Sequence, residues 1–561
     1  MLKPKFVSLL KHWKNYSLQQ LITDCTSGLI VGIVALPLAI AFAIASGVSP
    51  EKGLVTAIIG GFLVSSLGGS RVQIAGPTGA FVVIVYGVVQ KHGIEGLYVS
   101  TIMAGILLII LGFARIGSMI KFMPYPVIVG FTSGIAVIIF SSEIKDFLGL
   151  KMGSVPADFI QKWEQYGQHI NTANGYASVI AVGTMLMIIF GKKFFKQIPG
   201  SLAALILSTV AVHVFKLPVE TIGSRFGEIS HNFPPPIIPH VNLEAIRQLT
   251  SPIIAIALLG GIESLLSAVV ADGMIGGKHR SNMELIAQGI ANMVSPIFGG
   301  IPVTGAIART ATNINNGGRT PIAGIVHAII LLLIMLFLGK WVVYIPLACL
   351  AGILVIVAYN MSEWHSFVML LKSPRSDVIV LWGTFLITVI FDLTTAIQVG
   401  VILSVFLFMR RMALLANVRV VTDELDDDET DDENDDPNAI EKKQVPEGVE
   451  IYEINGPFFF GASYKFMEAM SSAGRNPRVR IIRMRNVLSL DATGLNALRE
   501  QHKNSLKHSI PFLISGIHTQ PLVALAQSGL LGDIGQENIF KSLDDALKRA
   551  NQILGEKAKE S

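Results

Sequence analysis

Two short stretches of the sequence place proline, threonine and glycine inside strongly apolar surroundings. AGPTGA occupies residues 75–80 and IPVTGAIART occupies residues 301–310, so that Thr78-Gly79-Ala80 and Thr304-Gly305-Ala306 lie 226 positions apart. Proline removes a backbone donor and glycine tolerates unusual dihedral angles, so each stretch is predicted to interrupt a helix. Irregular backbone inside an apolar segment survives only where protein or a watery cavity surrounds it.

A half-helix that begins at each break would offer a site for negative charge. A helix N-terminus carries an effective charge of about +0.5 together with unpaired N–H donors. Two such ends that face each other could bind an anion without a lysine or arginine at the centre of a span. The alternative is that proline and glycine only kink tightly packed helices. The pairing of the two breaks favours a substrate site.

A single carboxyl group lies deep in the apolar stretch LLGGIESLLSAVVADG. Glu263 has Ser264 and Ser267 close by in the sequence, whereas Asp272 and Asp392 lie nearer segment ends, where capping or surface roles are expected. An ionised carboxylate at that depth is costly unless it is paired. Glu263 is therefore a candidate coupling group that takes up and releases a proton. The alternative is a structural acid bonded to Ser267 or to the backbone.

Arg309, inside the second broken stretch, is the candidate charge partner of the site. It could pair with an acid on another helix, or it could neutralise a bound substrate. The residue types leave both roles open.

The amino-acid composition indicates that the chain carrying these broken stretches and buried charges is a membrane protein. Of 561 residues, 51% are apolar and 15% are charged, whereas a soluble protein has roughly a quarter charged residues. Charge is scarce over the first 412 residues and abundant afterwards. Apolar runs such as LIVGIVALPLAIAFAIASGV reach the length of about 20 residues that a spanning helix needs. The chain is therefore predicted to be a polytopic helical membrane protein with a soluble tail.

Fourteen apolar segments are predicted, several of them short or irregular. They lie near 26–48, 52–68, 72–90, 96–114, 123–141, 175–192, 198–216, 250–271, 284–300, 301–316, 321–339, 341–358, 377–392 and 395–412. Two halves of seven segments, each with a broken helix, are typical of transporters built from inverted repeats. An even count places both termini on one side of the membrane.

The placement of lysine and arginine predicts that the termini are cytoplasmic. On that assignment the inner loops contain Arg71, Arg115, Lys121, Lys192, Lys193, Lys196, Lys278, Arg280, Arg319, Lys372 and Arg375. Basic residues in the outer loops are spread through longer connections and mixed with acids. This distribution follows the positive-inside rule.

The predicted domains are a basic N-terminal segment, 1–22, a transport domain, 23–412, an acidic linker, 413–445, and an α/β domain, 446–555. The N-terminal segment is expected to form an interfacial amphipathic helix rather than a removable signal peptide. The linker contains DELDDDETDDENDD, which favours a solvated tether over a metal site. Cys25 and Cys349 are expected to be unpaired thiols.

The tail alternates strands and helices. EGVEIYEINGPFFFG is predicted to contain two short strands, VRIIRMRNV a buried strand, TGLNALREQHKNSLKHS a helix, PFLISGI a strand and SLDDALKRANQIL a closing helix. This alternation is typical of a small α/β domain.

No enzyme chemistry is evident in the sequence. GMIGGKHRS lacks the spacing and the Ser/Thr of a phosphate-binding loop, and no nucleophile elbow or metal-ligand cluster is present. We expect a transporter without a cofactor or metal, driven by an ion or substrate gradient. A channel, or a signalling role through the tail, are the alternative classes.

Several long blocks resemble the SulP/SLC26 anion transporters. They are LPLAIAFAIASGVSPEKGL with GGSRVQIAGPTGAF, GGIESLLSAVVADGMIGGKHRSNMELIAQGIANM and GGIPVTGAIARTATNINNGGRT, and the tail resembles the STAS domain of that family. The resemblance implies seven-plus-seven inverted repeats, a core domain that moves against a gate domain, and a homodimer. It also implies a multi-pass protein of the bacterial inner membrane, with a small anion, the coupling ion and the lipid bilayer as partners and no nucleic acid.

The resemblance also implies the position of the substrate. In the family the substrate lies between the N-termini of the third and tenth helices, with residues of the first helix completing the pocket. The corresponding residues here are Pro77, Thr78, Gly79, Ala80, Gly305, Ala306 and Ile307, with Leu38 and Phe42 from the first helix. Many relatives have glutamine at the position of Leu38, so that polar contact is in question.

The resemblance implies Glu263 and Ser267 as the ion-coupling residues. Sodium-coupled bicarbonate members have aspartate at the position of Glu263 and threonine at the position of Ile307. Loss of that threonine oxygen weakens a sodium site, which favours a proton as the coupling ion. Within the family the blocks are most similar to bacterial C4-dicarboxylic acid transport, so uptake of a succinate- or fumarate-like anion is expected. Sulfate or bicarbonate transport, anion exchange and an anion channel are the alternatives.

The tail departs from the family pattern at one position. In VLSLDATGLNAL, Asp491 is followed by Ala492 where the STAS loop carries a phosphorylatable serine, so phosphorylation at that residue is excluded. Thr493 is expected to help cap the next helix. Dimer contact or docking of a cytoplasmic protein partner is the expected role of the domain.

Overall fold

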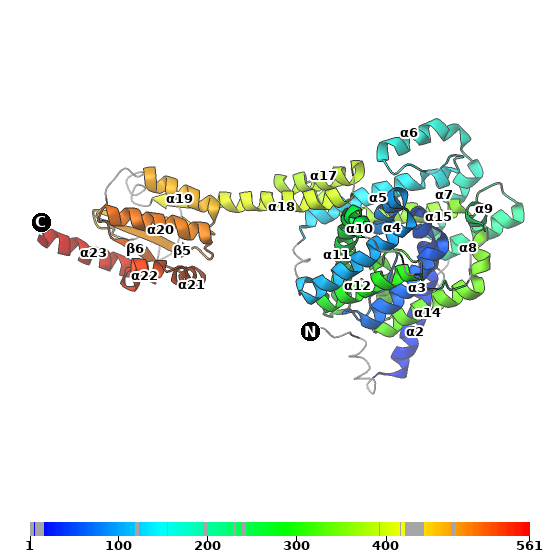
Figure 1. The fold of residues 1–561 in the computed structure, drawn as a ribbon, viewed down its shortest axis with the longest axis horizontal. Coiled ribbons are helices and arrows are strands. Elements are labelled where there is room, and N and C mark those ends of the chain that lie inside the picture. The colour runs from blue at the N-terminus through cyan, green and yellow to red at the C-terminus, as the bar shows by residue number, and fades with distance from the viewer. Residues whose placement is uncertain are drawn as a thin grey trace. The chain divides into compact units, whose positions relative to one another are not determined.

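The computed structural model describes residues 5, 16–117, 123–153, 155–194, 199–227, 232–237, 239, 243–391, 393–415, 417–420, 443–472 and 477–560. The chain separates into two compact units, Met1–Ser404 and Val405–Ser561 (Figure 1). Most of the predicted N-terminal segment and acidic linker, together with Asp392, Lys121 and Lys196, lie outside the described residues.

The first unit is helical. Its helices are α2 (Leu18–Ala45), α3 (Pro50–Leu67), α4 (Gly79–Phe113), α5 (Tyr125–Leu148), α6 (Phe159–His169), α7 (Gly175–Phe194), α8 (Gly200–Phe215), α9 (Ile222–Phe226), α10 (Leu243–Gln248), α11 (Thr250–Ile275), α12 (Ser281–Ile297), α13 (Ile307–Asn315), α14 (Pro321–Leu338), α15 (Leu347–Met361), α16 (Trp364–Leu370), α17 (Arg375–Ile390) and the first part of α18 (Leu393–Leu415).

Seven helices among the described residues are long and apolar enough to cross a membrane, or eight if one sharply bent pair counts as a span. The predicted segments 72–90 and 96–114 occur as one helix, α4, which is broken at Gly93 by a φ of 69°. Helices α8 and α17 have only 16 residues each. The count of fourteen spans in two repeats therefore stays a prediction.

The helices pack in two groups. In the first group α4 packs on α11 and α12, while α2 and α3 pack on α14. In the second group α5 packs on α15 and α17, and α15 packs on α7. Glycine allows the closest of these contacts, because a Cβ on Gly105 of α4 would lie 2.6 Å from the carbonyl oxygen of Gly289 on α12. Small residues at helix contacts let backbones approach closely inside a membrane.

The second unit is built on a five-stranded sheet in the order β3-β4-β5-β6-β7. Its strands are β3 (Asn417–Val420), β4 (Val449–Asn455), β5 (Val479–Asn486), β6 (Phe512–Ser515) and β7 (Ile539–Phe540), and only β3 is antiparallel to its neighbour. Its helices are α19 (Phe460–Ser472), α20 (Ala492–Lys507), α21 (Thr519–Gln527), α22 (Leu530–Ile534) and α23 (Leu543–Glu560).

Alternating side chains of the strands build two apolar cores. On β4 and β5, Tyr452 and Ile482 lie in a core with α19 to α22, whereas Ile451 and Ile481 lie in a second core with α23. Neighbouring side chains of a strand point to opposite faces, so helices cover both faces of the sheet.

Most of the predicted tail elements are present, but one expectation is wrong. The stretch EGVEIYEINGPFFFG holds one strand, β4, rather than two, and α19 begins at Phe460. The strand ends because Gly456 has a φ of 94° and Pro457 follows it. A single bridge between Phe458 and Leu490 is all that remains of the second strand.

Candidate functional site

The two broken stretches lie side by side. Strands β1 (Ala75–Gly76) and β2 (Thr304–Gly305) pair antiparallel, with Ala75 opposite Gly305 and Gly76 opposite Thr304. The amide of Ala306 extends the pairing by donating to the carbonyl of Ile74 at 2.8 Å. Two segments 226 positions apart in the sequence thus share one small sheet.

Each of these strands leads into the start of a helix. Helix α4 begins at Gly79 after the N-cap residue Thr78, and α13 begins at Ile307 after the N-cap residue Ala306. Neither N-cap side chain bonds the amides of its own helix. Because the first amides of a helix have no intrahelical acceptor, both helix starts have N–H donors for an anion.

Glu263 of α11 lies against the first of these helix starts. The hydroxyl of Thr78 donates to Oε2 of Glu263 at 2.9 Å. Both side chains are partly exposed, and Ile307 at the start of α13 is 44% exposed. Ser267 does not supply this bond, because its hydroxyl donates to Oγ1 of Thr310 at 3.4 Å. The acid is therefore joined to the candidate anion site and not to its own helix.

Arg309 of α13 places a buried positive charge behind the first break. Its side chain is 2% exposed, Nη2 donates to the carbonyl of Pro77, and Nη1 has no partner. A Cβ on Gly76 would lie 2.4 Å from Nη1. Within the described parts of the chain, no carboxylate lies within ion-pair distance of Arg309. The sequence left two roles open for Arg309, pairing with an acid or neutralising a substrate. Among the described residues, the pairing with an acid is absent.

Gly305 has no room for a Cβ unless Gln73 moves, and Gly79 is tightly packed. A Cβ on Gly305 would lie 1.7 Å from Nε2 of Gln73. A Cβ on Gly79 would lie 3.2 Å from Cδ1 of Ile139 on α5 and 3.3 Å from Sδ of Met361 on α15. Since α5 and α15 belong to the second packing group, the start of α4 lies at the boundary between the groups.

The first helix also reaches the site, through Phe42. Its Cε1 would lie 3.3 Å from a Cβ on Gly79, so the ring lies against the start of α4. Leu38, one helical turn earlier, is partly buried against the apolar core of the unit, and Ala80 is 1% exposed within it. These contacts leave an apolar surface on the α2 side of the site.

Sequence reasoning missed Asn292 and the role of Ser264, the polar residues that support the second break. Ser264 accepts from the amide of Gly305 at 3.1 Å and shares a 2.9 Å hydrogen bond with Thr304. The Asn292 side chain of α12 forms two hydrogen bonds with the backbone of Val303: it donates to the carbonyl at 2.8 Å and accepts from the amide at 2.9 Å. The available signal was a buried amide side chain in an otherwise apolar segment, because such a group needs a partner.

The structure also describes Asp272 and the two cysteines, for which the sequence predicts minor roles. Asp272 lies near a helix end and accepts from the amide and from Nδ1 of His279, at 2.8 and 2.7 Å. Cys25 and Cys349 are free thiols. Within the described residues, no group of three or more His, Cys, Asp or Glu side chains could hold a metal ion.

In the tail, the loop before α20 differs from its prediction in one respect. Asp491, not Thr493, is the N-cap of α20, and its Oδ1 accepts from the amide of Gly494 at 2.8 Å. Position accounts for this, because Asp491 directly precedes the first helical residue, Ala492, and aspartate is among the best N-cap residues. Ala492 and Thr493 are exposed in the first turn of the helix.

Sequence comparison supplies two domain matches and several full-length relatives. The sulfate permease family model matches residues 21–384, and the STAS domain model matches residues 441–546. The putative sulfate transporter YvdB of Bacillus subtilis (strain 168) is 40% identical over 535 residues, which cover 95% of this chain and 98% of that protein. The bicarbonate transporter BicA of Picosynechococcus is 31% identical over 546 residues, with 95% and 94% covered.

Structure comparison agrees on the fold. The murine Slc26a9 anion transporter in its inward-facing state has a TM-score of 0.87 to this chain at 19% identity, with 98% of this chain and 94% of that chain covered. At that level of identity the match establishes the fold alone.

Proposed function

Because the chain belongs to the sulfate permease family and carries a C-terminal STAS domain, we propose that it is a secondary transporter that moves a small anion across the membrane. The first packing group would act as the core domain and the second as the gate domain. We place the protein in the bacterial inner membrane as a homodimer with cytoplasmic termini. Fourteen spans in two inverted repeats are part of the same proposal.

The observation that carries this proposal is the meeting of β1 and β2, which joins the starts of α4 and α13. Each helix start contributes about half a positive charge, and Arg309 adds a buried charge without a carboxylate partner in the described structure. The sum is about two positive charges, and among the described residues Glu263 is the acid that bonds a helix start of the site. A buried charge without a partner is costly, so an anion bound beside Arg309 would be stabilised.

This charge balance favours a divalent anion when Glu263 carries a proton. Sulfate and a C4-dicarboxylate both match about two positive charges, whereas bicarbonate would match the site with Glu263 ionised. The names of the relatives support sulfate or bicarbonate, and the resemblance of the sequence blocks supports a succinate- or fumarate-like acid. We rank the divalent anions first.

Coupling to a proton follows from the position of Glu263. Its carboxylate accepts from Thr78, the N-cap residue of α4, so its charge state acts directly on an anion bound there. Protonation would remove a negative charge that repels the substrate. Ile307 presents an apolar side chain at the start of α13, which leaves fewer oxygen atoms for a sodium ion. Ser267 would support the site indirectly, through Thr310.

Movement of the core against the gate would expose the site to the two sides in turn. Gly79 lies against Phe42 of the core and against Ile139 and Met361 of the gate. The contact between the groups is therefore made at the substrate position. A bound anion and a protonated Glu263 would together lower the cost of crossing this apolar boundary, because each reduces uncompensated charge.

Reconstituted uptake tests the proposal. The purified full-length chain in proteoliposomes is given labelled succinate, fumarate, aspartate, sulfate or bicarbonate, with and without a pH gradient and with and without sodium. We expect concentrative uptake of sulfate or a C4-dicarboxylate that depends on the pH gradient. Uptake of bicarbonate alone, driven by sodium, would overturn the substrate ranking and the coupling ion. No uptake of any anion would overturn the proposed function.

A further inference from the structure

A cavity follows the first half of α4, away from the candidate anion site. Its volume is about 660 Å³, and both packing groups line it, through α4 and α11 on one side and α5 and α17 on the other. Its lining residues on α4 run from Val82, three residues beyond Gly79, to His92. At a rise of about 1.5 Å per residue, Val82 and His92 are about 15 Å apart along the helix. With cytoplasmic termini, this end of the unit faces the outside.

The lining of this cavity carries more positive than negative charge. Lys91, His92 and Lys162 line it, and Asp158 is the acidic residue among its lining residues. The carboxylate of Asp158 is committed to the N-cap of α6, where Oδ1 accepts from the amide of Gln161 at 2.9 Å. Clefts lined by charge of one sign concentrate ions of the opposite sign.

Lys162 is the buried cation of this cavity. Its side chain is 2% exposed, and Nζ donates to the hydroxyl of Ser142 on α5 at 2.9 Å. Among the residues that the structure describes, no carboxylate oxygen lies within 4.0 Å of its ammonium group. Glu143, buried next to Ser142 on α5, and Asp158 act on the Lys162 charge electrostatically at longer range, but neither bonds the ammonium group, and Glu143 does not line the cavity. One neutral hydroxyl leaves the other donors of the ammonium group for a ligand, since lysine has three.

Helix α6 holds Lys162 in place. Lys162 and Tyr166 are one helical turn apart and form its buried face. The hydroxyl of Tyr166 donates to the carbonyl of Ser141 at 2.9 Å, and its ring contacts Trp163 with centroids 5.9 Å apart. The ammonium group is therefore fixed against the outer end of α5.

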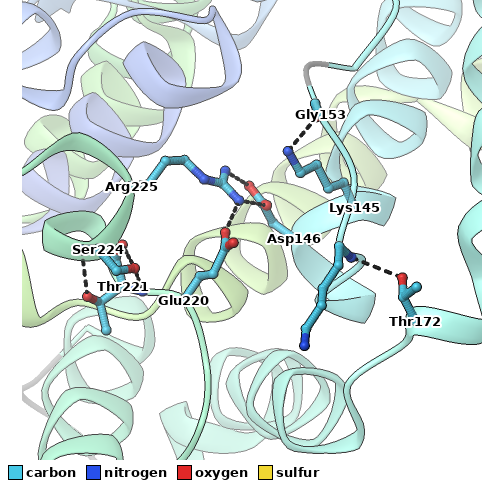
Figure 2. A network of polar contacts seen from close by, with 9 residues as sticks. Lys145, Asp146, Gly153, Thr172, Glu220, Thr221, Ser224 and Arg225 are labelled. Atoms are coloured by element: carbon cyan, nitrogen blue, oxygen red, sulfur yellow. Dashed lines mark hydrogen bonds and ion pairs between the residues drawn. The ribbon is translucent and has the colours of Figure 1, made fainter.

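Two other cations at this end of α5, Arg225 and Lys145, already have partners, as Figure 2 shows. Arg225 forms hydrogen bonds of 2.9 and 2.6 Å with Asp146 and bonds Glu220 as well, and Lys145 donates to the carbonyl of Gly153 at 2.8 Å. Burial would lower the pKa of Arg225, but its bonds to the two carboxylates raise it overall. Neither Arg225 nor Lys145 lines the cavity.

We propose that this cavity is an outer loading site for small anions, in which Lys162 receives the anion before it reaches the start of α4. The inference rests on the proposed function, because the loaded anion is the one that the central site transports. Sulfate and carboxylates of similar size are the class of ligand, since charge and size are what the lining recognises.

Transport kinetics separate a loading role from a structural role. Lys162→Met removes the charge at similar length, Lys162→Arg keeps it, and Ser142→Ala removes the hydrogen bond but keeps the ammonium group. We expect Lys162→Met to raise the KM for the transported anion about ten-fold at low ionic strength, with Vmax unchanged and with substantial rescue by Lys162→Arg. Lys145→Met, which removes a charge outside the cavity, should leave KM within about two-fold.

Two kinetic results would overturn the proposal. The first is an unchanged KM in Lys162→Met. The second is a defect of equal size in Ser142→Ala, which would assign the effect to the tie between α5 and α6 rather than to charge.

Binding measured without transport separates this proposal from the proposed function. Sodium sulfate and sodium succinate are titrated calorimetrically into the full-length chain carrying Gly79→Leu, which fills the central site. We expect saturable binding in Gly79→Leu that is lost in the double variant with Lys162→Met. Binding in the parent chain but none in Gly79→Leu would overturn the loading site alone. Binding in neither chain, with no transport, would overturn both.

Discussion

The hydroxyl of Thr78 donates a 2.9 Å hydrogen bond to the carboxylate of Glu263. This bond joins the N-cap residue of α4 to the one acid of the apolar part of α11. Since the start of α4 is the candidate anion site, the charge on Glu263 and the charge on the substrate share one location. Coupling between them then needs no long pathway, because the two charges interact directly.

Replacement of Gly305 by a large residue should abolish transport, because the space that a side chain would need is already occupied by the Gln73 amide. A Cβ on Gly305 would lie 1.7 Å from Nε2 of Gln73 and 3.2 Å from Cα of Ser264. Gly305→Ala is expected to displace the Gln73 amide, which donates to the carbonyl of Ser264 at 3.1 Å, and to cost about 1–3 kcal/mol of stability, the usual range for overpacking. Gly305→Leu should eliminate uptake in proteoliposomes.

Gly273→Ala is the matched control, because a Cβ on Gly273 of α11 meets no atom within 4 Å. That variant should transport normally. Full uptake by Gly305→Leu would show that the β1–β2 pair is not part of the substrate site.

Removal of the charge on Arg309 should weaken substrate binding. Arg309→Met keeps much of the side-chain length but loses the charge and the bond to the carbonyl of Pro77. A hydrogen bond to a charged group contributes about 1.5–3 kcal/mol, which corresponds to roughly a 10- to 150-fold weaker affinity. The measurement is the KM for uptake together with calorimetric binding.

Arg309→Lys separates charge from geometry in this case. It should recover part of the affinity, because charge is retained while the reach to Pro77 is reduced. If Arg309→Met binds the anion as tightly as the parent chain, Arg309 is a structural tie between α13 and the first break.

The two backbone breaks and the acid of α11 can be predicted from the sequence because each leaves a local mark. Proline and glycine next to Thr78 and Thr304 mark broken backbone, and α4 and α13 indeed begin just after them. A carboxyl group in an apolar run, such as Glu263, is conspicuous for the same reason. These signals depend on neighbouring residues alone.

The partners of those residues could not be predicted, because they come from distant parts of the chain. Thr78 and Glu263 are 185 positions apart, and Arg309 and Pro77 are 232 apart. Ser267, one helical turn from Glu263, is the hydroxyl that the structural alternative pairs with this acid, but it bonds Thr310 instead. In the tail, the second strand expected near Phe458 fails because Gly456 turns the backbone. Tertiary packing decides the hydrogen-bond partners, whereas the turn at Gly456 is a local feature.

Deletion of the tail should leave substrate preference unchanged. The cut belongs after Leu415, because β3 pairs with β4 and is part of the tail sheet. Since the candidate site residues all lie before residue 404, within the first unit, the truncated chain should keep the same ranking of anions. Its rate or its thermal stability is expected to fall.

The uptake panel used for the parent chain provides the measurement. Asp491→Ala in the full-length chain is a milder control, since loss of an N-cap bond costs about 1 kcal/mol and disturbs only α20. A changed ranking of anions in the truncated chain would place part of the selectivity in the tail.

Glu263→Gln should uncouple transport from the pH gradient. The amide has the shape of the protonated acid, so the variant holds the site permanently in its neutral form and removes the charge that repels an anion. We expect it to bind and exchange the substrate but to lose accumulation driven by a proton gradient. Thr78→Val provides the companion variant, because it removes the hydroxyl donor and keeps the acid.

Counterflow and gradient-driven uptake in the same proteoliposomes distinguish the outcomes. Coupling by Glu263 requires that counterflow persists in Glu263→Gln while gradient-driven uptake falls to the level without a gradient. Thr78→Val should keep a response to pH, since a titrating carboxyl is still present, but with a shifted midpoint because its hydrogen-bond donor is gone. If Glu263→Gln still concentrates the anion with unchanged pH dependence, Glu263 serves only to hold Thr78 and another group carries the proton.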